Sequence, residues 1–311
     1  GSCRCVGDRL LDKGRARWQF LDVLSSKLEK LRELLASFDS CMVAYSGGVD
    51  SALLAYLAHK TLGDRAIAAI ADSPSLPRRE FTEAVALANQ FEFPLEIVRT
   101  REFENEEYLS NPINRCFFCK HELFTELEPL ARERGCKVIA YGENASDIGD
   151  HRPGAKAAAE FEVRAPLKEV GLSKDEIREL SAQFGLPTAS KPQLACLSSR
   201  IPYGERVTPE KLRMIEEAED FLRDAEFRDV RVRHHEVKGA EGEGEVRGAR
   251  GSMARIEVAP EDVPRISSAE RRSEIEAALS GIGYASIEID PQGYRRGSMN
   301  VGKVDALAPA G

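Results

Sequence analysis

The chain has 311 residues, of which 42% are hydrophobic and 31% charged, and its formal net charge is −8. This length exceeds what one hydrophobic core comfortably supports, so we expect two domains. The composition leaves no apolar stretch of about 18 residues or more that could span a membrane. The negative charge disfavours a large nucleic-acid partner without excluding one.

The cysteines and the first residues indicate the cellular setting. Residues Gly1 to Cys5 lack the charged region and apolar run that a secretory signal needs. Seven cysteines spread over the chain favour reduced thiols over a disulfide framework. We therefore expect a soluble, cytoplasmic protein in which some cysteines bind metal or react.

Strands and helices alternate in the N-terminal part. Apolar residues at helical spacing predict a first helix, and short apolar runs predict strands. The predicted strands are Cys41–Tyr45, Ala66–Ala71, Leu95–Arg99 and Lys137–Tyr141. The predicted helices are Leu21–Phe38, Ser51–Leu62, Arg79–Gln90, Lys120–Arg134 and Lys174–Phe184, the last with Ser173 as its N-cap. This alternation predicts an α/β fold over residues 1–200, with a parallel sheet covered by helices on both faces.

A smaller α+β domain is predicted over residues 201–311. Its helices are expected at Pro209–Ala225 and Ser268–Ser280, and its strands at Val230–Val237, Ala254–Val258 and Tyr284–Asp290. Between two of these strands, Lys238–Ser252 is rich in glycine and charge. That composition favours a mobile loop over packed structure.

A phosphate-binding loop is predicted at Ser46–Ser51, which reads SGGVDS and joins a strand to a helix. Backbone N–H groups, hydroxyls and the positive end of the helix dipole can hold phosphate there, and the glycines permit close approach. No lysine follows as in a Walker A loop, so a kinase-type grip on the β and γ phosphates is not indicated. A glycine turn that only enters a helix is the alternative.

The SGGVDS string resembles the PP-loop of ATP pyrophosphatases, enzymes that release pyrophosphate and leave AMP on the substrate. The resemblance implies that Gly47 and Gly48 let ATP approach, that Ser46 and Ser51 donate hydroxyls, and that Asp50 helps to hold Mg²⁺. The next strand ends in Asp72 and Ser73, where this family contacts the nucleotide. A turn or a helix cap is an equal alternative for that pair.

Three cysteines form a second candidate site. Cys116 and Cys119 have the Cys-x-x-Cys spacing that brings two sulfurs to one metal or to each other, and Cys196 is a third thiol. Three thiolates could hold three irons of a [4Fe-4S] cluster and leave the fourth open to bind sulfide. The flanking cations, which favour thiolate over thiol, are Arg115, Lys120, Lys191 and Arg200.

A cysteine can also be a small buried hydrophobe, the usual fate of a free thiol. We expect this for Cys41 and Cys136, which lie in or beside predicted core strands.

Together these segments resemble the LarE family of ATP-dependent sulfur transferases from about Asp39 to Lys303. The other matching segments are Gly142–Asn144, Asp150–Gly154, Lys191–Gly204 and Tyr294–Asn300. The resemblance implies that a carboxylate of pyridinium-3,5-biscarboxylic acid mononucleotide is adenylated and then converted to a thiocarboxylate for a nickel-pincer nucleotide. It also implies a homo-oligomer, a hexamer in the family.

The resemblance offers two sulfur donors. Members with three cysteines carry a [4Fe-4S] cluster that delivers a sulfide, and Cys116, Cys119 and Cys196 match that type. Other members sacrifice the cysteine that corresponds to Cys196 and leave dehydroalanine. Both donors stay open, with Cys196 and Asp50 as the predicted catalytic residues.

The resemblance places Arg200, Arg231 and Arg233 near the substrate phosphate, which suits the fork geometry of guanidinium groups. A solvated strand face is the alternative for Arg231 and Arg233. Glu143 and Ser146 stand where the family is expected to have Thr and Asp, so no role is assigned to them.

Two competing functions remain at this point. A tRNA thiolase pairs the same loop with three cysteines, but it should bring a basic surface or zinc-finger appendages. A non-enzymatic ATP or metal carrier would store metal on its cysteines. Pyrophosphate release that depends on a small carboxylate would count against that carrier.

Overall fold

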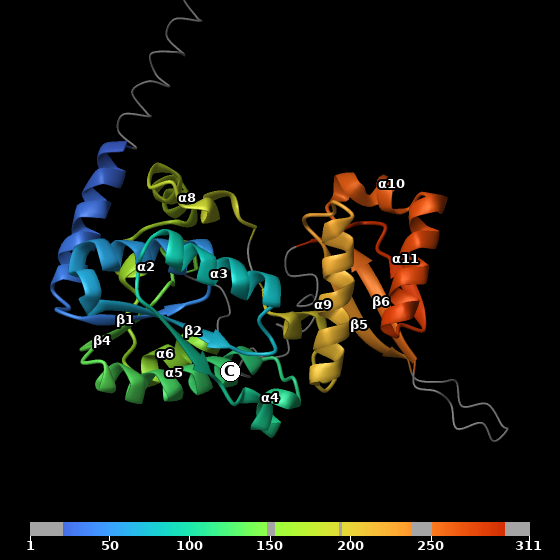
Figure 1. The fold of residues 1–311 in the computed structure, drawn as a ribbon, viewed down its shortest axis with the longest axis horizontal. Helices are drawn as coiled ribbons and strands as arrows, with labels where there is room; N and C mark the ends of the chain where they lie inside the picture. The colour runs from blue at the N-terminus through green and yellow to red at the C-terminus, as the bar shows by residue number, and fades with distance from the viewer. Residues whose placement is uncertain (1–20, 148–152, 193–194, 238–250, 296–311) are drawn as a thin grey trace, which may run out of the picture. The chain divides into compact units, whose positions relative to one another are not determined.

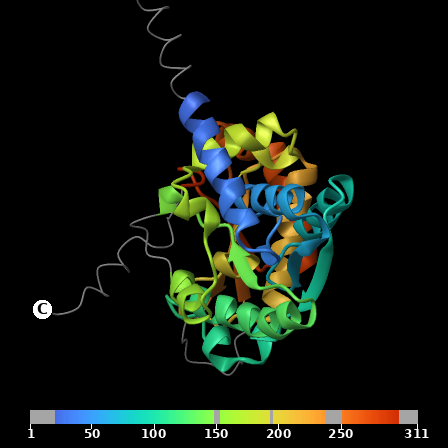
Figure 2. The same ribbon diagram turned by 90° about the vertical axis from the view of Figure 1, so that its left-hand side faces the viewer.

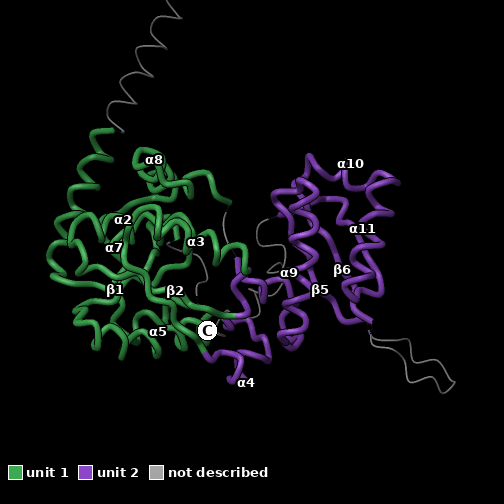
Figure 3. Tube along the Cα trace, viewed as in Figure 1, with its two compact units in different colours: residues 1–73, 78–100, 116–193 green, residues 74–77, 101–115, 194–311 purple. Residues whose placement is uncertain are grey.

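The structure is a computed structural model that describes residues 21–147, 153–192, 195–237 and 251–295. The chain forms two compact units, which Figure 3 shows in separate colours. Unit 1 comprises residues 1–73, 78–100 and 116–193, and unit 2 comprises residues 74–77, 101–115 and 194–311. Two short segments of the N-terminal half therefore group with the C-terminal residues. The division into domains at residues 1–200 and 201–311 remains a prediction.

Unit 1 is built on a parallel four-stranded sheet with strand order β3-β2-β1-β4. The strands are β1 (Cys41–Tyr45), β2 (Ala66–Asp72), β3 (Leu95–Arg99) and β4 (Val138–Tyr141). Because all four run in the same direction, their carboxyl ends lie at one edge of the sheet. Loops that follow β1, β2 and β4 therefore meet at that edge, where ligands of such sheets bind.

Helices cover both faces of this sheet, as Figure 1 and the turned view in Figure 2 show. On one face α5 and α6 pack on Met42, Ala69 and Val98, with Phe124 and Leu127 buried between the layers. On the other face α2 contacts β1, β2 and α8. The helices of this unit, besides one over residues 21–36, are α2 (Val49–Leu62), α3 (Arg78–Gln90), α5 (Arg115–Glu133, whose first residue belongs to unit 2), α6 (Pro153–Glu160), α7 (Pro166–Glu169) and α8 (Lys174–Gln183).

Unit 2 contains a three-stranded sheet with helices on one face. Strand β6 (Gly251–Glu257) pairs antiparallel with β5 (Arg231–Val237) and parallel with β7 (Ser286–Ile289). Its core joins apolar residues of the sheet to α9 (Pro209–Asp224) and α11 (Ala269–Ile282), and α4 (Glu106–Leu109) and α10 (Val263–Ile266) are short helices. The small α+β architecture predicted for the C-terminal part is confirmed.

The predicted α/β class with its parallel sheet is also confirmed. Strands β1 and β3 have the predicted bounds, and Ser173 caps α8 through a reciprocal pair of hydrogen bonds with Glu176. Helix α5 begins at Arg115 rather than at Lys120, so the Cys-x-x-Cys segment lies in a helix. Strand β6 begins at Gly251, and the rest of the glycine-rich segment, 238–250, lies outside the described residues. Residues 150–152, 193–194 and 296–300 of the matching segments also lie outside them.

Within the described ranges, none of the helices combines the length and the apolar character needed to cross a lipid bilayer.

Candidate active site

The SGGVDS residues form a tight loop between β1 and α2. The hydroxyl of Ser51 accepts a hydrogen bond from the backbone N–H of Ser46 at 3.1 Å and lies 3.0 Å from the hydroxyl of Ser46. The N-cap of α2 is Gly48, which has no side chain to cap the first N–H groups of the helix. Those N–H groups and the two hydroxyls can therefore bind an anion such as a phosphate.

Two glycines allow the backbone to come close at this loop. Gly47 has a φ of 71°, and a Cβ there would lie 2.7 Å from the Cβ of Ala84 on α3. Gly142 follows β4, and a Cβ there would lie 2.8 Å from the backbone nitrogen of Ser51. A side chain at either position would push the loop away from its neighbours, so the glycines set its shape.

Asp50 lies in the first turn of α2, where it is held by residues that are distant in sequence. Its carboxylate accepts a hydrogen bond from Asn144 Nδ2 at 3.1 Å and pairs with Lys174 Nζ at 2.5 Å. Lys174 is the first residue of α8, and its backbone N–H donates to the hydroxyl of Ser146 at 3.0 Å. The residues that contact Asp50, directly or through one another, are therefore Asn144, Lys174 and Ser146. The sequence analysis assigned no role to them.

The predicted N-cap at Ser173 is the sequence feature that could have indicated that Lys174 lies near the site. It places the lysine at the start of a helix that follows the sheet, but the partner of the ammonium group is 124 residues away in the chain. The ammonium of Lys174 adds positive charge beside the Asp50 carboxylate, close to the loop that can bind an anion.

We expect Lys174→Met to lower the rate of substrate-dependent pyrophosphate release about a hundredfold, because one charge that stabilises the leaving group is lost. The release of pyrophosphate from Mg-ATP measures this effect. Lys137→Met is the control, since Lys137 pairs with Asp39 at 2.6 Å on the chain segments that lead into β1 and β4, away from the phosphate loop. Equal rates of pyrophosphate release in the two variants would show that Lys174 is not part of the site.

Asp72 and Ser73 end β2 at the same edge of the sheet. Arg78 at the start of α3 pairs with the Asp72 carboxylate at 2.5 Å and donates to the Ser73 carbonyl oxygen at 2.8 Å. Asp72 is half-buried and Ser73 is buried. These contacts close the turn between β2 and α3, and nucleotide binding by the two residues stays a prediction.

Cys116 and Cys119 lie one helical turn apart near the start of α5, in unit 1. Cys116 is exposed and Cys119 is half-buried. Residues three apart lie on one face of a helix, so both thiols face the same side. Two thiols in this arrangement suit iron or another thiophilic metal.

Two other cysteines have the properties of core residues. Burial raises the pKa of the Cys41 thiol to about 12, and burial also raises the pKa of Cys136. Both therefore remain protonated near neutral pH and are poor metal ligands. This agrees with the prediction that they are packing residues.

Cys196 lies in unit 2, at the start of a short 3-10 helix, Leu197–Arg200. Its sulfur is 3.9 Å from Nη2 of Arg115, and its carbonyl oxygen accepts hydrogen bonds from Ser199 Oγ at 2.7 Å and Arg200 Nη1 at 2.9 Å. The Arg115 guanidinium can therefore donate a hydrogen bond to this sulfur. Within the ranges that the structure describes, no three His, Cys, Asp or Glu side chains gather to hold a metal.

Arg200, one of the three predicted phosphate ligands, is buried in an ion pair. The residue is 1% exposed, and its guanidinium donates to both carboxylate oxygens of Glu219 on α9, at 2.8 and 3.0 Å. Burial alone would raise the pKa of Glu219, but Arg200 and Arg223 hold it below its usual value, so the pair is ionic. This geometry anchors the 3-10 helix after Cys196 to α9, and phosphate binding by Arg200 stays a prediction.

Arg231 and Arg233 project from β5 and are buried rather than solvated. Arg233 pairs with Glu257 on β6 at 2.7 Å. Arg231 stacks on Tyr294 at 5.1 Å, and burial together with the charge of Arg200 lowers its pKa. An anion beside Arg231 would offset this crowding of positive charge, which suits the predicted contact with a phosphate.

The chain is similar to several known proteins. A family model described as NAD synthase matches residues 21–146. The uncharacterised protein slr1717 of Synechocystis is 40% identical over 89% of this chain and 98% of its own. Pyridinium-3,5-bisthiocarboxylic acid mononucleotide synthase of Lactiplantibacillus plantarum is 28% identical over 89% of this chain and 95% of its own. One subunit of the glutamine-hydrolysing GMP synthase of Pyrococcus furiosus is 27% identical over 63% of this chain and 66% of its own.

Proposed function

Because the chain belongs to the PP-loop family that it shares with slr1717 and the LarE-type mononucleotide synthase, we propose that it inserts sulfur into a carboxylate of pyridinium-3,5-biscarboxylic acid mononucleotide. The protein is an ATP-dependent enzyme that forms AMP and pyrophosphate. The observation that carries the proposal is the phosphate loop, with Asp50 and Lys174 paired beside the uncapped start of α2.

The phosphate loop supports adenylation as the first step. The substrate carboxylate attacks the α-phosphorus of ATP, the bond to the β-phosphate oxygen breaks, and pyrophosphate leaves. Negative charge develops on the leaving pyrophosphate. This charge can be stabilised by N–H groups at the start of α2, by the hydroxyls of Ser46 and Ser51 and by the ammonium of Lys174. The acyl adenylate that results is electrophilic at its carboxyl carbon.

The residues present fit the Mg²⁺ that this family uses. Asp50 supplies a carboxylate at the phosphate loop, and Mg²⁺ in such sites binds one or two carboxylates together with substrate phosphates. Lys174 and Asn144 fix the orientation of that carboxylate. Bound Mg²⁺ would neutralise charge on the phosphates.

The thiols of Cys116, Cys119 and Cys196 also fit an iron-sulfur cluster, because thiolate is the ligand that such clusters prefer. Bound through three cysteines, a [4Fe-4S] cluster would supply a sulfide for transfer. Nη2 of Arg115 lies 3.9 Å from the Cys196 sulfur and can donate a hydrogen bond to it. The alternative is that Cys196 itself donates its sulfur to the acyl adenylate and becomes dehydroalanine.

The buried arginines of unit 2 suit the phosphate of a mononucleotide. Arg231 is buried and stacks on Tyr294, and a phosphate could add a second negative charge beside it to that of Glu219. We further propose a cytoplasmic location and a homo-oligomer, a hexamer by analogy with the family.

The test is a reaction of anaerobically purified and reconstituted protein with Mg-ATP and the pyridinium dicarboxylate mononucleotide. We expect pyrophosphate release that depends on the mononucleotide and a product whose mass shows oxygen replaced by sulfur. Pyrophosphate release that depends on tRNA instead would establish a tRNA thiolase. Tight ATP or metal binding without turnover on either substrate would establish a carrier.

A further inference from the structure

Arg115 is buried in unit 2, where its guanidinium contacts Cys196 and the backbone that follows it. Nη2 lies 3.9 Å from the Cys196 sulfur, and Nη1 donates to the carbonyl oxygen of Ser198 at 2.9 Å. A guanidinium is planar and offers its N–H donors in fixed directions. A group that holds the plane of this guanidinium therefore also determines where Nη2 points.

Asn111 is such a group. Its side-chain oxygen accepts a hydrogen bond from Nη1 of Arg115. Its Nδ2 donates to the carbonyl oxygens of Ile201 at 3.2 Å and Pro202 at 2.7 Å. Asn111 is fully buried, where polar groups that lose their partners are costly, so these hydrogen bonds resist breaking. One side chain thus links the guanidinium of Arg115 to the end of the segment that follows Cys196.

The backbone after Cys196 is also held at other points within unit 2. The hydroxyl of Tyr108 lies 2.7 Å from that of Ser198, and both residues are buried. The backbone N–H of Gly204 donates to the carbonyl oxygen of Asn111 at 2.9 Å. The main chain therefore has a fixed course here, and the direction of the Cys196 thiol depends on the group that contacts its sulfur.

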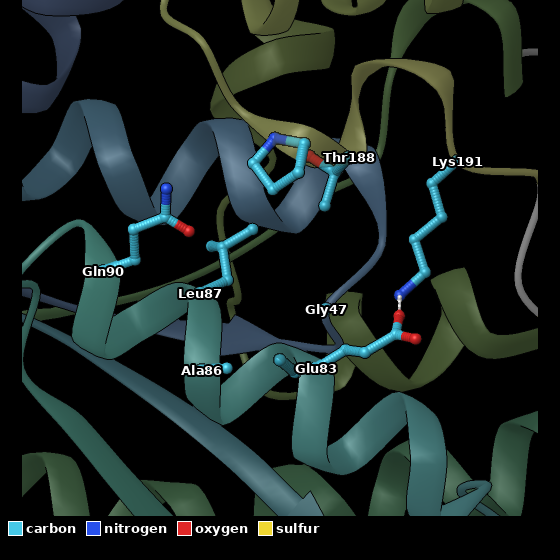
Figure 4. A pocket seen from close by; sticks show the side chains of 9 residues that line it. Gly47, Glu83, Ala86, Leu87, Gln90, Thr188 and Lys191 are labelled. Carbon is cyan, nitrogen blue, oxygen red and sulfur yellow. Dashed lines mark hydrogen bonds and ion pairs between the residues drawn. The ribbon is translucent and has the colours of Figure 1, made fainter.

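Two other cations that the sequence placed beside the cysteines have carboxylate partners. Lys191 lines a cavity of about 260 Å³ in unit 1, and its ammonium lies 2.5 Å from Glu80 Oε2 and 2.8 Å from Glu83 Oε2 (Figure 4). Arg200 is buried in its ion pair with α9. Arg115, in contrast, contacts the Cys196 sulfur with its side chain. An effect on the thiol is therefore expected from Arg115 and from the residue that orients it.

We propose that Asn111 is a positioning residue for Cys196 that acts through Arg115. Asn111 fixes the plane of the guanidinium, and the guanidinium holds the Cys196 sulfur in one direction. The positioning depends only on contacts within unit 2. Its importance for sulfur transfer rests on the proposed function, in which Cys196 takes part.

Two substitutions of Asn111 separate positioning from folding. Asn111 has a φ of 55°, which glycine and aspartate adopt more readily than most residues. Asn111→Gly removes all side-chain contacts, whereas Asn111→Asp keeps an acceptor for Arg115 but cannot donate to the carbonyl oxygens of Ile201 and Pro202. Both substitutions should lower the thermal unfolding temperature by a few degrees, because buried hydrogen-bonding groups lose partners.

Alkylation of Cys196 by iodoacetamide, in the reduced, iron-free full-length protein, measures the positioning. We expect Asn111→Gly to raise the alkylation rate about fivefold relative to that of Cys136, because the thiol is held less often against the guanidinium. Asn111→Asp should leave the rate near the wild-type value. The control is Asn105→Gly, which removes the side-chain cap of α4 and should not change the rate. Alkylation that rises with the loss of stability in both Asn111 variants would show a purely structural role and overturn the proposal.

A double-mutant cycle tests whether Asn111 acts through Arg115. Arg115→Met should raise the alkylation rate of Cys196 by about the same factor as Asn111→Gly. In the double variant we expect no further increase, because the guanidinium that Asn111 orients is absent. Effects that multiply in the double variant would mean that the two residues act independently, which contradicts the proposal.

Sulfur transfer supplies a second readout. We expect thiocarboxylate formation to fall about tenfold in Asn111→Gly, as small misplacements of reacting groups do, while substrate-dependent pyrophosphate release stays within about twofold of the wild-type rate. Asn111→Asp should recover most of the transfer. If wild-type protein transfers no sulfur but the alkylation results are as expected, the proposed function fails and the positioning role stands. Unchanged alkylation in Asn111→Gly would overturn the positioning role, as would an equal loss of pyrophosphate release and sulfur transfer.

Discussion

Asp50→Ala is expected to lower pyrophosphate formation by at least about a hundredfold, since groups that stabilise developing charge carry effects of that size. The carboxylate lies at the phosphate loop, is fixed by Asn144 and Lys174, and would ligate Mg²⁺. It is half-buried at the surface of α2, so its loss should cost only about 1 kcal/mol of folding free energy. Pyrophosphate release and thermal unfolding, measured on the same preparation, separate the two effects.

Asp50→Asn refines this test. The amide oxygen can still accept the hydrogen bond from Asn144, but the charge that pairs with Lys174 and Mg²⁺ is gone. We expect Asp50→Asn to be nearly as inactive as Asp50→Ala. The control is Asp64→Asn, an exposed carboxylate just beyond the other end of α2. A folded Asp50→Asn protein that releases pyrophosphate at the wild-type rate would refute the assignment of the loop.

The phosphate loop and its sheet could be predicted because their pattern is local. Cys41–Tyr45 is a short apolar run that ends at SGGVDS, so both the strand and the glycine turn are visible within about ten residues. The Ser173 cap is similarly local, because its partner Glu176 is three residues away. Elements of this kind follow from neighbouring residues alone.

The partners of the site residues could not be predicted because they depend on tertiary contacts. Lys174 reaches Asp50 across 124 residues, and only the sheet topology brings them together. The start of α5 was placed five residues late because Cys116–Cys119 is mostly apolar and shows no helical alternation of polar residues. The burial of Arg200 against Glu219 could not be predicted from the sequence either, because an arginine in a polar segment is normally exposed.

Single alanine substitutions of Cys116, Cys119 and Cys196 are expected to abolish most sulfur transfer and to leave substrate-dependent pyrophosphate release near the wild-type rate. A cluster held by three thiolates loses a ligand in each variant, whereas the phosphate loop keeps all its contacts. Iron and acid-labile sulfide, measured after anaerobic reconstitution, should fall in all three variants. Thiocarboxylate formation, followed by mass, should fall with them.

Cys41→Ala and Cys136→Ala are the matched controls. Burial keeps both thiols protonated, so neither substitution should change iron content or sulfur transfer, although Cys41→Ala lowers stability through lost packing in β1. If Cys196 is instead the sacrificial donor, only its substitution stops the transfer. Intact-mass measurement after turnover then shows that the protein has lost one sulfur and two hydrogens as Cys196 becomes dehydroalanine. A Cys116→Ala protein that transfers sulfur at the normal rate would exclude the cluster, because exposed Cys116 then has no part in delivering sulfur.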